Sequence, residues 1–346
     1  MKTTYSIIGG MAGSSMDGLD LSHVIFKKEN TGWRYQLGKC ETIPYDKEIF
    51  DALKGAEALS QTEKETLDHQ FGEWIGGKIK VFSSDIENID LVGLHGHTVI
   101  HQPDNKISWQ LGKGEVIAKT INLPTITEFR NEDILNGGQG APLVPFGDFT
   151  LFKEYDACLN LGGIANISVR KNQTAWDICP CNQVLNYFAN KFGHPYDHNG
   201  DMASQGALDK DFYSRISQID YFKQPPPKSL PNNFISTNIL DAADPKDGLH
   251  TYCKIISEQV ANSVSKDSQG SMLISGGGAL NSFLIRTIKN ELPGWDIEVP
   301  EPKVANFKES LIFAFLALKR LRNETNVLST VTGASKDTSS GVIHLP

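Results

Sequence analysis

Near its start the chain reads Ile7-Ile8-Gly9-Gly10-Met11-Ala12-Gly13-Ser14-Ser15-Met16-Asp17-Gly18-Leu19-Asp20, and this stretch decides the fold. An apolar, strand-like run enters a loop of glycines and serines, and a second strand-like run leaves it at Leu19. Glycines let the backbone turn sharply and approach a ligand closely, and successive N–H groups in such a turn form a concave anion site. Ser14 and Ser15 add hydroxyl donors, and Asp17 could hold a cation beside a phosphate. An ordinary tight hairpin explains the loop alone equally well.

Two further glycine turns favour the ligand-binding interpretation. Residues 157–170 repeat the order strand, glycine turn, strand, with Gly162-Gly163 at the turn. The run Gly276-Gly277-Gly278 lies between an apolar segment and a helical pattern. A hairpin used twice, about half a chain apart, together with a glycine turn between a strand and a helix, indicates a duplicated nucleotide-binding architecture with an α/β fold.

Blocks along the whole chain follow the pattern of one family. They are Gly13-Ser14-Ser15-Met16-Asp17-Gly18-Leu19-Asp20, Leu94-His95-Gly96-His97-Thr98-Val99-Ile100-His101-Gln102-Pro103, Ser108-Trp109-Gln110-Leu111-Gly112, Glu128-Phe129-Arg130, Gly137-Gly138-Gln139-Gly140-Ala141-Pro142-Leu143-Val144-Pro145, Asn160-Leu161-Gly162-Gly163-Ile164-Ala165-Asn166-Ile167, Gly276-Gly277-Gly278-Ala279-Leu280-Asn281 and Val331-Thr332-Gly333-Ala334. In these blocks the chain resembles the 1,6-anhydro-N-acetylmuramate kinase family. A single glycine block is a weak signal, but their number and order make the resemblance specific.

The resemblance implies a two-lobed actin-like (ribonuclease H-like) ATPase fold with the active site in the cleft between the lobes. We expect an N-terminal lobe over residues 1–145 and a C-terminal lobe over residues 146–346, with the last helix packing back on the first lobe. A length of 346 residues suits two packed lobes. The glycine-rich segment 137–145 is the expected turning region between them.

The same resemblance implies ATP and Mg²⁺ as the cofactors. The hairpin loop and the turn at Gly162 and Gly163 would cradle the phosphates, the adenosine would lie near the third glycine turn, and Asp17 would hold the metal. The residues expected to bind ATP are Gly13, Ser14, Ser15, Met16, Asp17, Gly18, Leu19, Asp20, Gly162, Gly163, Gly276, Gly277 and Gly278.

For the sugar, the resemblance implies contacts from His95, His97, Trp109, Arg130 and Glu309. On a strand, His95 and His97 would share a face. We rank three interpretations of this pair: first a polar wall that contacts the substrate, second solvated or structural histidines, and last a zinc site. Trp109 offers a flat face to a sugar ring, and a core role is the alternative. Arg130 can bind the lactyl carboxylate in bidentate fashion, or form a surface salt bridge. Glu309 matches a family glutamate that faces the sugar, or is a solvated residue of a first helical turn.

Asp177 is the expected catalytic base. Family members carry Asp-Thr-Gly-Pro-Gly-Asn after the second hairpin, and the matching residues here are Asp177-Ile178-Cys179-Pro180-Cys181-Asn182. A helix-capping role for Asp177 is the alternative. The two cysteines replace family glycines, which would alter a turn that needed positive φ.

The mechanism implied by the resemblance couples ring opening to phosphorylation. Asp177 would remove a proton from water that attacks C1 of the 1,6-anhydro sugar, and the departing O6 would take the γ-phosphoryl group of ATP. The product would be N-acetylmuramate 6-phosphate, in the recycling of cell-wall sugar. The alternatives are another small-molecule sugar kinase of the same fold and a non-catalytic actin-like nucleotide sensor.

Composition excludes several other classes of protein. Hydrophobic residues make up 39% and charged residues 21% of the chain, as in ordinary globular proteins. A net charge of -8 without a basic run argues against nucleic-acid binding. We expect a cytoplasmic protein without a signal peptide or a membrane partner, and the resemblance implies a homodimer. The five cysteines are scattered, which predicts structural thiols rather than a disulfide framework.

Helical periodicity adds local expectations. Apolar residues at helical spacing predict a helix over residues 62–82, with Thr62 and Glu65 as its capping box. The P-loop-like run from Gly72 to Lys78 lies inside this helix, whereas a P-loop must precede one, so we reject it as a nucleotide site.

Overall fold

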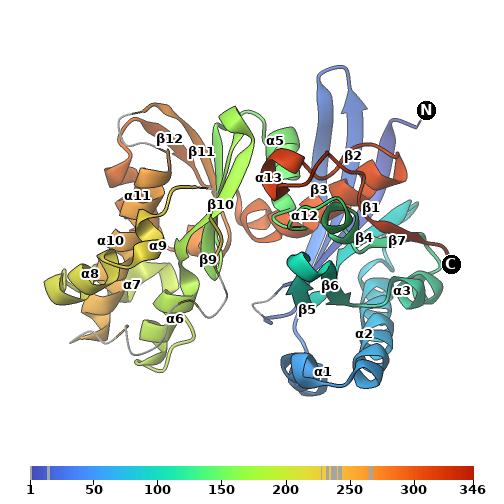
Figure 1. Cartoon of the computed structure of the whole chain (residues 1–346), viewed down its shortest axis with the longest axis horizontal. Helices are drawn as coiled ribbons and strands as arrows, with labels where there is room; N and C mark the ends of the chain where they lie inside the picture. The colour runs from blue at the N-terminus through green and yellow to red at the C-terminus, as the bar shows by residue number, and fades with distance from the viewer. Residues whose placement is uncertain are drawn as a thin grey trace. The chain divides into compact units, whose positions relative to one another are not determined.

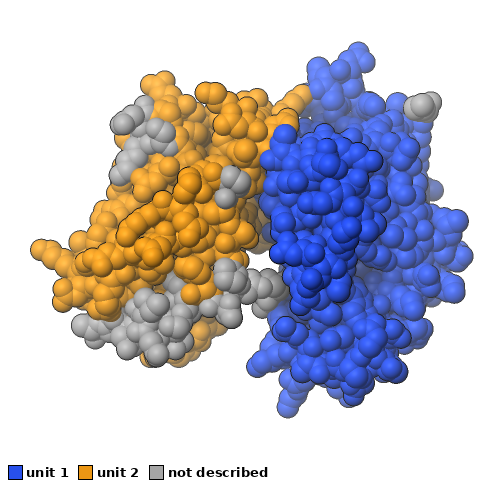
Figure 2. Space-filling view, in the orientation of Figure 1, with its two compact units in different colours: residues 1–151, 307–346 blue, residues 152–306 orange. Residues whose placement is uncertain are grey.

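The chain forms two compact units, which Figure 2 distinguishes by colour. The computed structural model describes residues 2–13, 16–226, 228–230, 234, 240, 244–264 and 268–346. Unit 1 contains residues 1–151 and 307–346, and unit 2 contains residues 152–306. Among the described residues, none of the helices combines the length and the apolar character needed to cross a membrane.

Unit 1 is built on a mixed sheet with the strand order β13-β7-β4-β1-β2-β3 (Figure 1). The parallel strands are β1 (Thr4–Ala12), β4 (Leu91–His95) and β7 (Thr125–Thr127). Antiparallel partners extend the sheet on both sides, namely β2 (Leu19–Glu29), β3 (Gly32–Ile43) and β13 (Val342–His344). The carboxyl ends of β1, β4 and β7 therefore meet at one edge, where α/β proteins bind their ligands.

Helices cover both faces of this sheet. The helices are α1 (Lys47–Gly55), α2 (Gln61–Phe82), α3 (Gly114–Ile121), α4 (Asn131–Leu135), α5 (Val144–Leu151), α12 (Pro302–Leu321) and α13 (Ser329–Thr332). A separate hairpin pairs β5 (His97–Gln102) with β6 (Ile107–Leu111). Helix α2 buries Phe71 and Ile75 in a cluster with Ile8 and Leu94 of the sheet, as its apolar periodicity predicts.

Two strand glycines explain how α12 packs against this sheet. A Cβ at Gly9 would overlap the carbonyl of Ser310, and a Cβ at Gly93 would overlap the side chain of Ala317. The sequence interpretation that Gly9 and Gly10 belong to the ligand loop is therefore wrong. Strand β1 continues to Ala12, where Gly9 allows the close approach of α12 and a Cβ at Gly10 would meet Leu94 of β4.

The capping box of α2 also differs from the prediction. The helix begins at Gln61, and Ser60 is its N-cap. The Ser60 side chain accepts from the Glu63 backbone, and the Glu63 carboxylate accepts from the backbone N–H of Ser60 at 2.8 Å. Both pairs have the same spacing, so the pattern alone could not separate them, and the box with Thr62 and Glu65 is wrong.

Unit 2 repeats the strand pattern of unit 1. Its sheet has the order β10-β9-β8-β11-β12. The strands are β8 (Ala157–Leu161), β9 (Ile164–Val169), β10 (Thr174–Pro180), β11 (Gly270–Ser275) and β12 (Trp295–Glu298). Strands β10, β9 and β8 pair antiparallel, and β11 and β12 then extend the sheet in parallel beyond β8. Unit 1 shows the same pattern in the order β3-β2-β1-β4-β7. The predicted α/β fold with a duplicated actin-like core is confirmed.

The helices of unit 2 surround this second sheet. They are α6 (Asn182–Asn190), α7 (Asp201–Ser204), α8 (Lys210–Ser217), α9 (Asp220–Lys223), α10 (Pro245–Val264) and α11 (Ser282–Glu291). The core of the unit gathers Phe188, Phe212 and Tyr252 around the strands.

The units differ from the predicted lobes in their boundaries. Unit 1 extends to Leu151, and residues 307–346 return to it, because α12 packs on its sheet and β13 pairs with β7. The glycine-rich segment 137–145 also lies inside unit 1. Buried Asp133 holds this segment by accepting from the Gly140 backbone at 2.8 Å and from the Thr332 hydroxyl at 2.7 Å.

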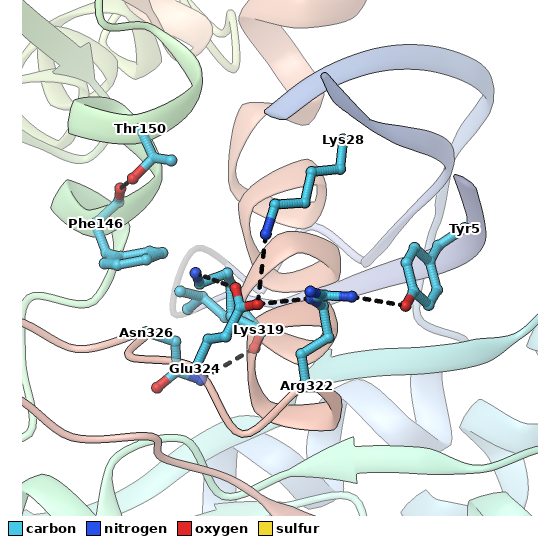
Figure 3. Close-up of polar contacts among 9 residues, drawn as sticks. Tyr5, Lys28, Phe146, Thr150, Lys319, Arg322, Glu324 and Asn326 are labelled. Carbon is cyan, nitrogen blue, oxygen red and sulfur yellow. Dashed lines mark hydrogen bonds and ion pairs between the residues drawn. The ribbon is translucent and has the colours of Figure 1, made fainter. Parts of the chain in front are cut away.

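A polar cluster fastens the end of α12 within unit 1 (Figure 3). The Glu324 carboxylate accepts from Lys319 at 2.5 Å and from Arg322 at 2.8 Å. Nζ of Lys28 lies 3.8 Å from Oε1 of Glu324. Arg322 also donates to the hydroxyl of Tyr5 on β1 at 3.0 Å. Burial alone would raise the pKa of Glu324, but the hydrogen bonds from Lys319 and Arg322 outweigh it and lower that pKa.

This cluster predicts a pH-dependent contribution to stability. Glu324→Gln should lower the free energy of unfolding at pH 7 by about 1–3 kcal/mol, the usual worth of hydrogen bonds to a charged group. Because the folded-state pKa is depressed, the contribution is present above the unfolded-state value and is lost as the pH falls below about 4.5. Urea unfolding from pH 3 to pH 8 measures it, with the exposed Glu57→Gln as the control. An equal difference at every pH would contradict the prediction.

Candidate active site

The first glycine turn joins β1 to β2 within unit 1. Ser14 and Ser15 lie outside the described residues, and Asp17 is exposed after the turn. Met16 has a φ of 56°, in the left-handed region. A Cβ at Gly18 would overlap the Ile43 carbonyl at the end of β3, so this glycine is needed by the fold whatever the loop binds.

Asp20 follows on β2 and has the properties of a cation ligand. Burial raises the pKa of Asp20 to about 6, a hydrogen bond from Thr42 opposes the rise, and the charge of Asp17 adds to it. The Thr42 hydroxyl donates to Asp20 at 2.5 Å. A buried carboxylate next to a second carboxylate suits a hard cation, and Mg²⁺ commonly uses one or two carboxylates together with substrate phosphates. The described residues contain no cluster of three metal-ligating side chains.

His95 and Arg130 form a buried pair at the carboxyl edge of the sheet. His95 ends β4, and its Nε2 accepts from Nε of Arg130 at 3.0 Å. Arg130 also donates from Nη1 to the carbonyl of Gly140 at 2.8 Å. Burial holds the pKa of His95 well below its ordinary value, and Arg130 lowers it further. His95 is therefore neutral at pH 7 and leaves the guanidinium as the charge of this pair.

His97 lies on the next strand rather than on the strand of His95. Gly96 separates β4 from β5, so the expectation that the two histidines share one strand face is wrong. Burial lowers the pKa of His97, and a hydrogen bond with the backbone of Gly13 opposes that shift. His97 therefore lies beside the first glycine turn.

Trp109 and His95 line one cavity of about 200 Å³ in unit 1. The remaining residues expected to bind sugar, His97, Arg130 and Glu309, are not among its lining. Asp68 of α2 accepts from the Gly112 backbone at 2.7 Å and takes part in a hydrogen bond with the side chain of Trp109. Asp68 thus fixes the position of the indole.

Glu309 lies in the first half of α12 among several charges of unit 1. Burial raises the pKa of Glu309, Lys308 opposes the rise, and Asp20 and Asp148 add to it. Lys308 and Asp148 form an ion pair at 2.8 Å, and each side chain is only 3% exposed. The charges of Asp20 and Arg130 in unit 1 thus both act on Glu309, since Asp20 raises its pKa and Arg130 lowers it.

Unit 2 brings the second and third glycine turns together. The turn after β8 offers its carbonyls to the start of α6, because the Gly162 carbonyl accepts from Asn182 at 3.1 Å and the Gly163 carbonyl from Cys181 at 2.8 Å. Gly276 has a φ of 84°, and a Cβ there would lie 2.5 Å from Oδ1 of Asn160. A Cβ at Gly278 would lie 2.8 Å from Cβ of Leu161.

Other glycines of these turns are not explained by packing. A Cβ at Gly162 would have its nearest neighbour at 3.4 Å, and one at Gly277 at 3.7 Å, which are ordinary van der Waals contacts. Neither residue has positive φ. The absence of side chains at Gly162 and Gly277 fits a ligand that approaches the backbone closely.

Asp177 lies in β10 at a β-bulge rather than at a helix cap. The register against β9 shifts between Asp177 and Cys179, and bulges often re-aim a side chain beside active sites. Its carboxylate accepts from the Leu230 backbone at 2.9 Å and from the Ser229 hydroxyl at 3.2 Å. Burial raises the pKa of Asp177, and these two hydrogen bonds oppose the rise.

Comparison with known proteins decides the family. The family model described as anhydro-N-acetylmuramic acid kinase matches residues 5–346. The chain belongs to the anhydro-N-acetylmuramic acid kinase family.

Curated relatives and solved structures complete the comparison. The anhydro-N-acetylmuramic acid kinase of Azorhizobium caulinodans is 32% identical, over 98% of this chain and 99% of its own length. That of Vibrio cholerae is 31% identical over 98% of both chains. A solved activator of 2-hydroxyisocaproyl-CoA dehydratase from Clostridium difficile, with bound ADPNP, is 14% identical with a TM-score of 0.46 and covers 92% of this chain and 97% of its own. The predicted family is confirmed, and with it the class of phosphotransferase.

Cys179 and Cys181, where the family resemblance implies glycines, lie in β10 and at the N-cap of α6. Neither Cys179 nor Cys181 has positive φ, so neither position lies in the left-handed region that favours glycine. Both thiols are fully buried in the core of unit 2. Burial raises the pKa of both, which makes them unreactive packing groups.

Sequence reasoning missed three acidic or basic side chains of the candidate site. Asp68 reads as a solvated helix residue, and Asp148 lies in a short apolar helix far along the chain from Lys308. Of the three, only Lys308 could have been found from the sequence, because it is the neighbour of Glu309 in the chain.

Proposed function

We propose that this chain is an ATP-dependent anhydro-N-acetylmuramic acid kinase that opens the 1,6-anhydro ring with water and phosphorylates O6. The water oxygen bonds to C1 as the C1–O6 bond breaks, and Asp177 takes the water proton. The O6 oxygen takes the γ-phosphoryl group of ATP, so that N-acetylmuramate 6-phosphate and ADP are released. The physiological role is the recycling of cell-wall sugar.

One observation carries the role of Asp177. A carboxylate at a β-bulge, with a pKa raised by burial, is a stronger base than an exposed aspartate. Its hydrogen bonds with Ser229 and Leu230 hold it in one orientation while it accepts a proton.

For the sugar, we assign recognition to side chains of unit 1. Arg130 uses Nε and one Nη1 hydrogen in its bonds with His95 and Gly140, and a guanidinium has five N–H donors. The remaining donors can bind the lactyl carboxylate of the muramyl group. Trp109 offers its indole face to the ring, His95 and His97 offer neutral nitrogens, and Glu309 accepts from a sugar hydroxyl.

ATP is the phosphoryl donor in this proposal, as membership of a kinase family supports. We assign its phosphates to the backbone N–H groups of the turns at Gly13–Gly18 and Gly162–Gly163, and its adenosine to Gly276–Gly278. Asp17 and Asp20 would hold Mg²⁺, which neutralises phosphate charge when bound. A cytoplasmic homodimer, as the family resemblance implies, completes the proposal.

The experiment that tests this function is the reaction itself in ¹⁸O-water. Purified protein with ATP, Mg²⁺ and 1,6-anhydro-N-acetylmuramate should give a phosphosugar that carries one ¹⁸O atom at the C1 hydroxyl and none in the phosphate, as mass spectrometry of fragments shows. An unlabelled phosphosugar would indicate simple phosphorylation of a free hydroxyl. No product from any anhydro sugar would favour a nucleotide sensor.

A glycine substitution tests the phosphate turn of unit 2. Gly162→Ala should fold normally, because its Cβ has room within the unit, and should raise the KM for ATP about tenfold or more, or ~1.4 kcal/mol. Gly276→Ala is the matched comparison, since its positive φ and close neighbour predict a loss of thermal stability instead. Steady-state kinetics and thermal melts of both variants measure this contrast. An unchanged KM in Gly162→Ala would remove this turn from the phosphate site.

A further inference from the structure

Unit 2 contains a second cavity far from its glycine turns. The cavity has a volume of about 690 Å³, which lies within the range of ligand pockets, roughly 300–1,000 Å³. Residues at the amino ends of β8, β11 and β12 line it, together with the β9–β10 hairpin and the end of α10. The turns at Gly162 and Gly276 follow the carboxyl ends of β8 and β11, roughly 16–20 Å away along strands of five and six residues.

Two tryptophans form the apolar part of this cavity. Trp176 of β10 is 8% exposed, and Trp295 begins β12. A Cβ at Gly270 would lie 2.9 Å from the six-membered ring of Trp295, so the glycine lets the indole lie close against β11. Nε1 of Trp295 is buried and has no hydrogen-bond partner among the described residues. The carbon atoms of the ring, and not its N–H, are therefore the part of Trp295 that a ligand in this cavity can contact.

The polar lining is mostly neutral. It includes the amides of Asn172, Asn262 and Gln269 and the hydroxyl of Ser263. Asp156 also lines the cavity, but its carboxylate accepts from Arg170 at 2.9 Å and from the Ser271 backbone at 3.1 Å. Lys171, on the β9–β10 hairpin, contributes a positively charged side chain to the lining of the cavity.

We propose that this cavity is an accessory binding site for an uncharged saccharide. Indole rings pack against the apolar faces of sugar rings, and side-chain amides and hydroxyls exchange hydrogen bonds with sugar hydroxyls. The neutral lining disfavours a nucleotide or another polyanion, because Lys171 alone would face several negative charges.

Isothermal titration calorimetry with N,N′-diacetylchitobiose as the probe tests the site on the full chain. Wild-type protein should bind one equivalent in unit 2, and Trp295→Leu should weaken binding at least tenfold. Gly270→Ala should have a similar effect, because its Cβ displaces the indole, and Trp295→Phe should restore part of the affinity. Lys171→Ala is the matched control, which should leave the affinity for this neutral probe within about twofold.

Two readouts separate this site from the proposed active site. Kinase turnover of Trp295→Leu should equal that of the wild type, which also shows that the variant is folded. Binding that survives Trp295→Leu and disappears in Trp109→Leu would place the probe in the cavity of unit 1 and overturn the proposal. The absence of any binding heat at about 10 mM probe would overturn it as well, whether or not the protein is an active kinase.

Discussion

Asp177→Asn is expected to lower kcat by about two to four orders of magnitude, the usual cost of losing a general base. The amide keeps the shape of the side chain and can still accept from Ser229 and Leu230, so the fold around β10 should persist. The dissociation constants for ATP and for the anhydro sugar should change by less than a few fold, because neither ligand needs this carboxylate for its main contacts. Single-turnover kinetics with separate binding titrations measure the two effects.

The pH dependence of turnover provides a second test of Asp177. A base acts in its ionised form, and burial raises the pKa of Asp177 above its ordinary value of 3.8. The kcat of the wild type should therefore fall as the pH drops toward that raised pKa, and residual activity of Asp177→Asn should lack this limb. Asp220→Asn changes an exposed carboxylate of the same unit and serves as the control. A full rate in Asp177→Asn would refute the proposed mechanism.

Much of the fold could be predicted because its determinants are local in sequence. The glycine turns at residues 13–18 and 162–163 each join two antiparallel strands, so the duplicated hairpin could be seen without any long-range information. The role of Gly9 could not be seen, because it depends on the Ser310 backbone of α12. The return of residues 307–346 to unit 1 also depends on packing between segments far apart in the chain, so it could be expected only from the family resemblance and not from local periodicity.

The candidate site could be predicted only where one block of sequence carries the chemistry. Trp109 and His95 do share a cavity, although nothing in their separate blocks required it. The alternative of a helix cap for Asp177 is wrong, because this residue lies in β10 beside a register shift and accepts from Ser229. Register shifts of this kind depend on the partner strand and leave no mark on local periodicity.

The buried pair of Asp148 and Lys308 should produce the largest change in stability. Its nitrogen and oxygen atoms are 2.8 Å apart, and it joins α5 to α12 one residue before Glu309. Removing one partner leaves a buried charge, so Asp148→Asn and Lys308→Met should each lower the free energy of unfolding by about 3–5 kcal/mol. The double variant Asp148→Asn/Lys308→Met should recover most of this loss, because both charges are gone. Urea unfolding of the four proteins gives the complete cycle.

The same variants should shift Glu309 in opposite directions, which separates a role at the active site from simple stability. Lys308 lowers the pKa of Glu309 and Asp148 raises it. Lys308→Met should therefore raise the pKa of Glu309, and Asp148→Asn should lower it, as ¹³C NMR of the labelled carboxyl group can measure under folding conditions. We expect the double variant to lie between the two single variants. Equal shifts in both single variants would mean that they act through a disturbed α12 rather than through their charges, and the pair would then be a structural link alone.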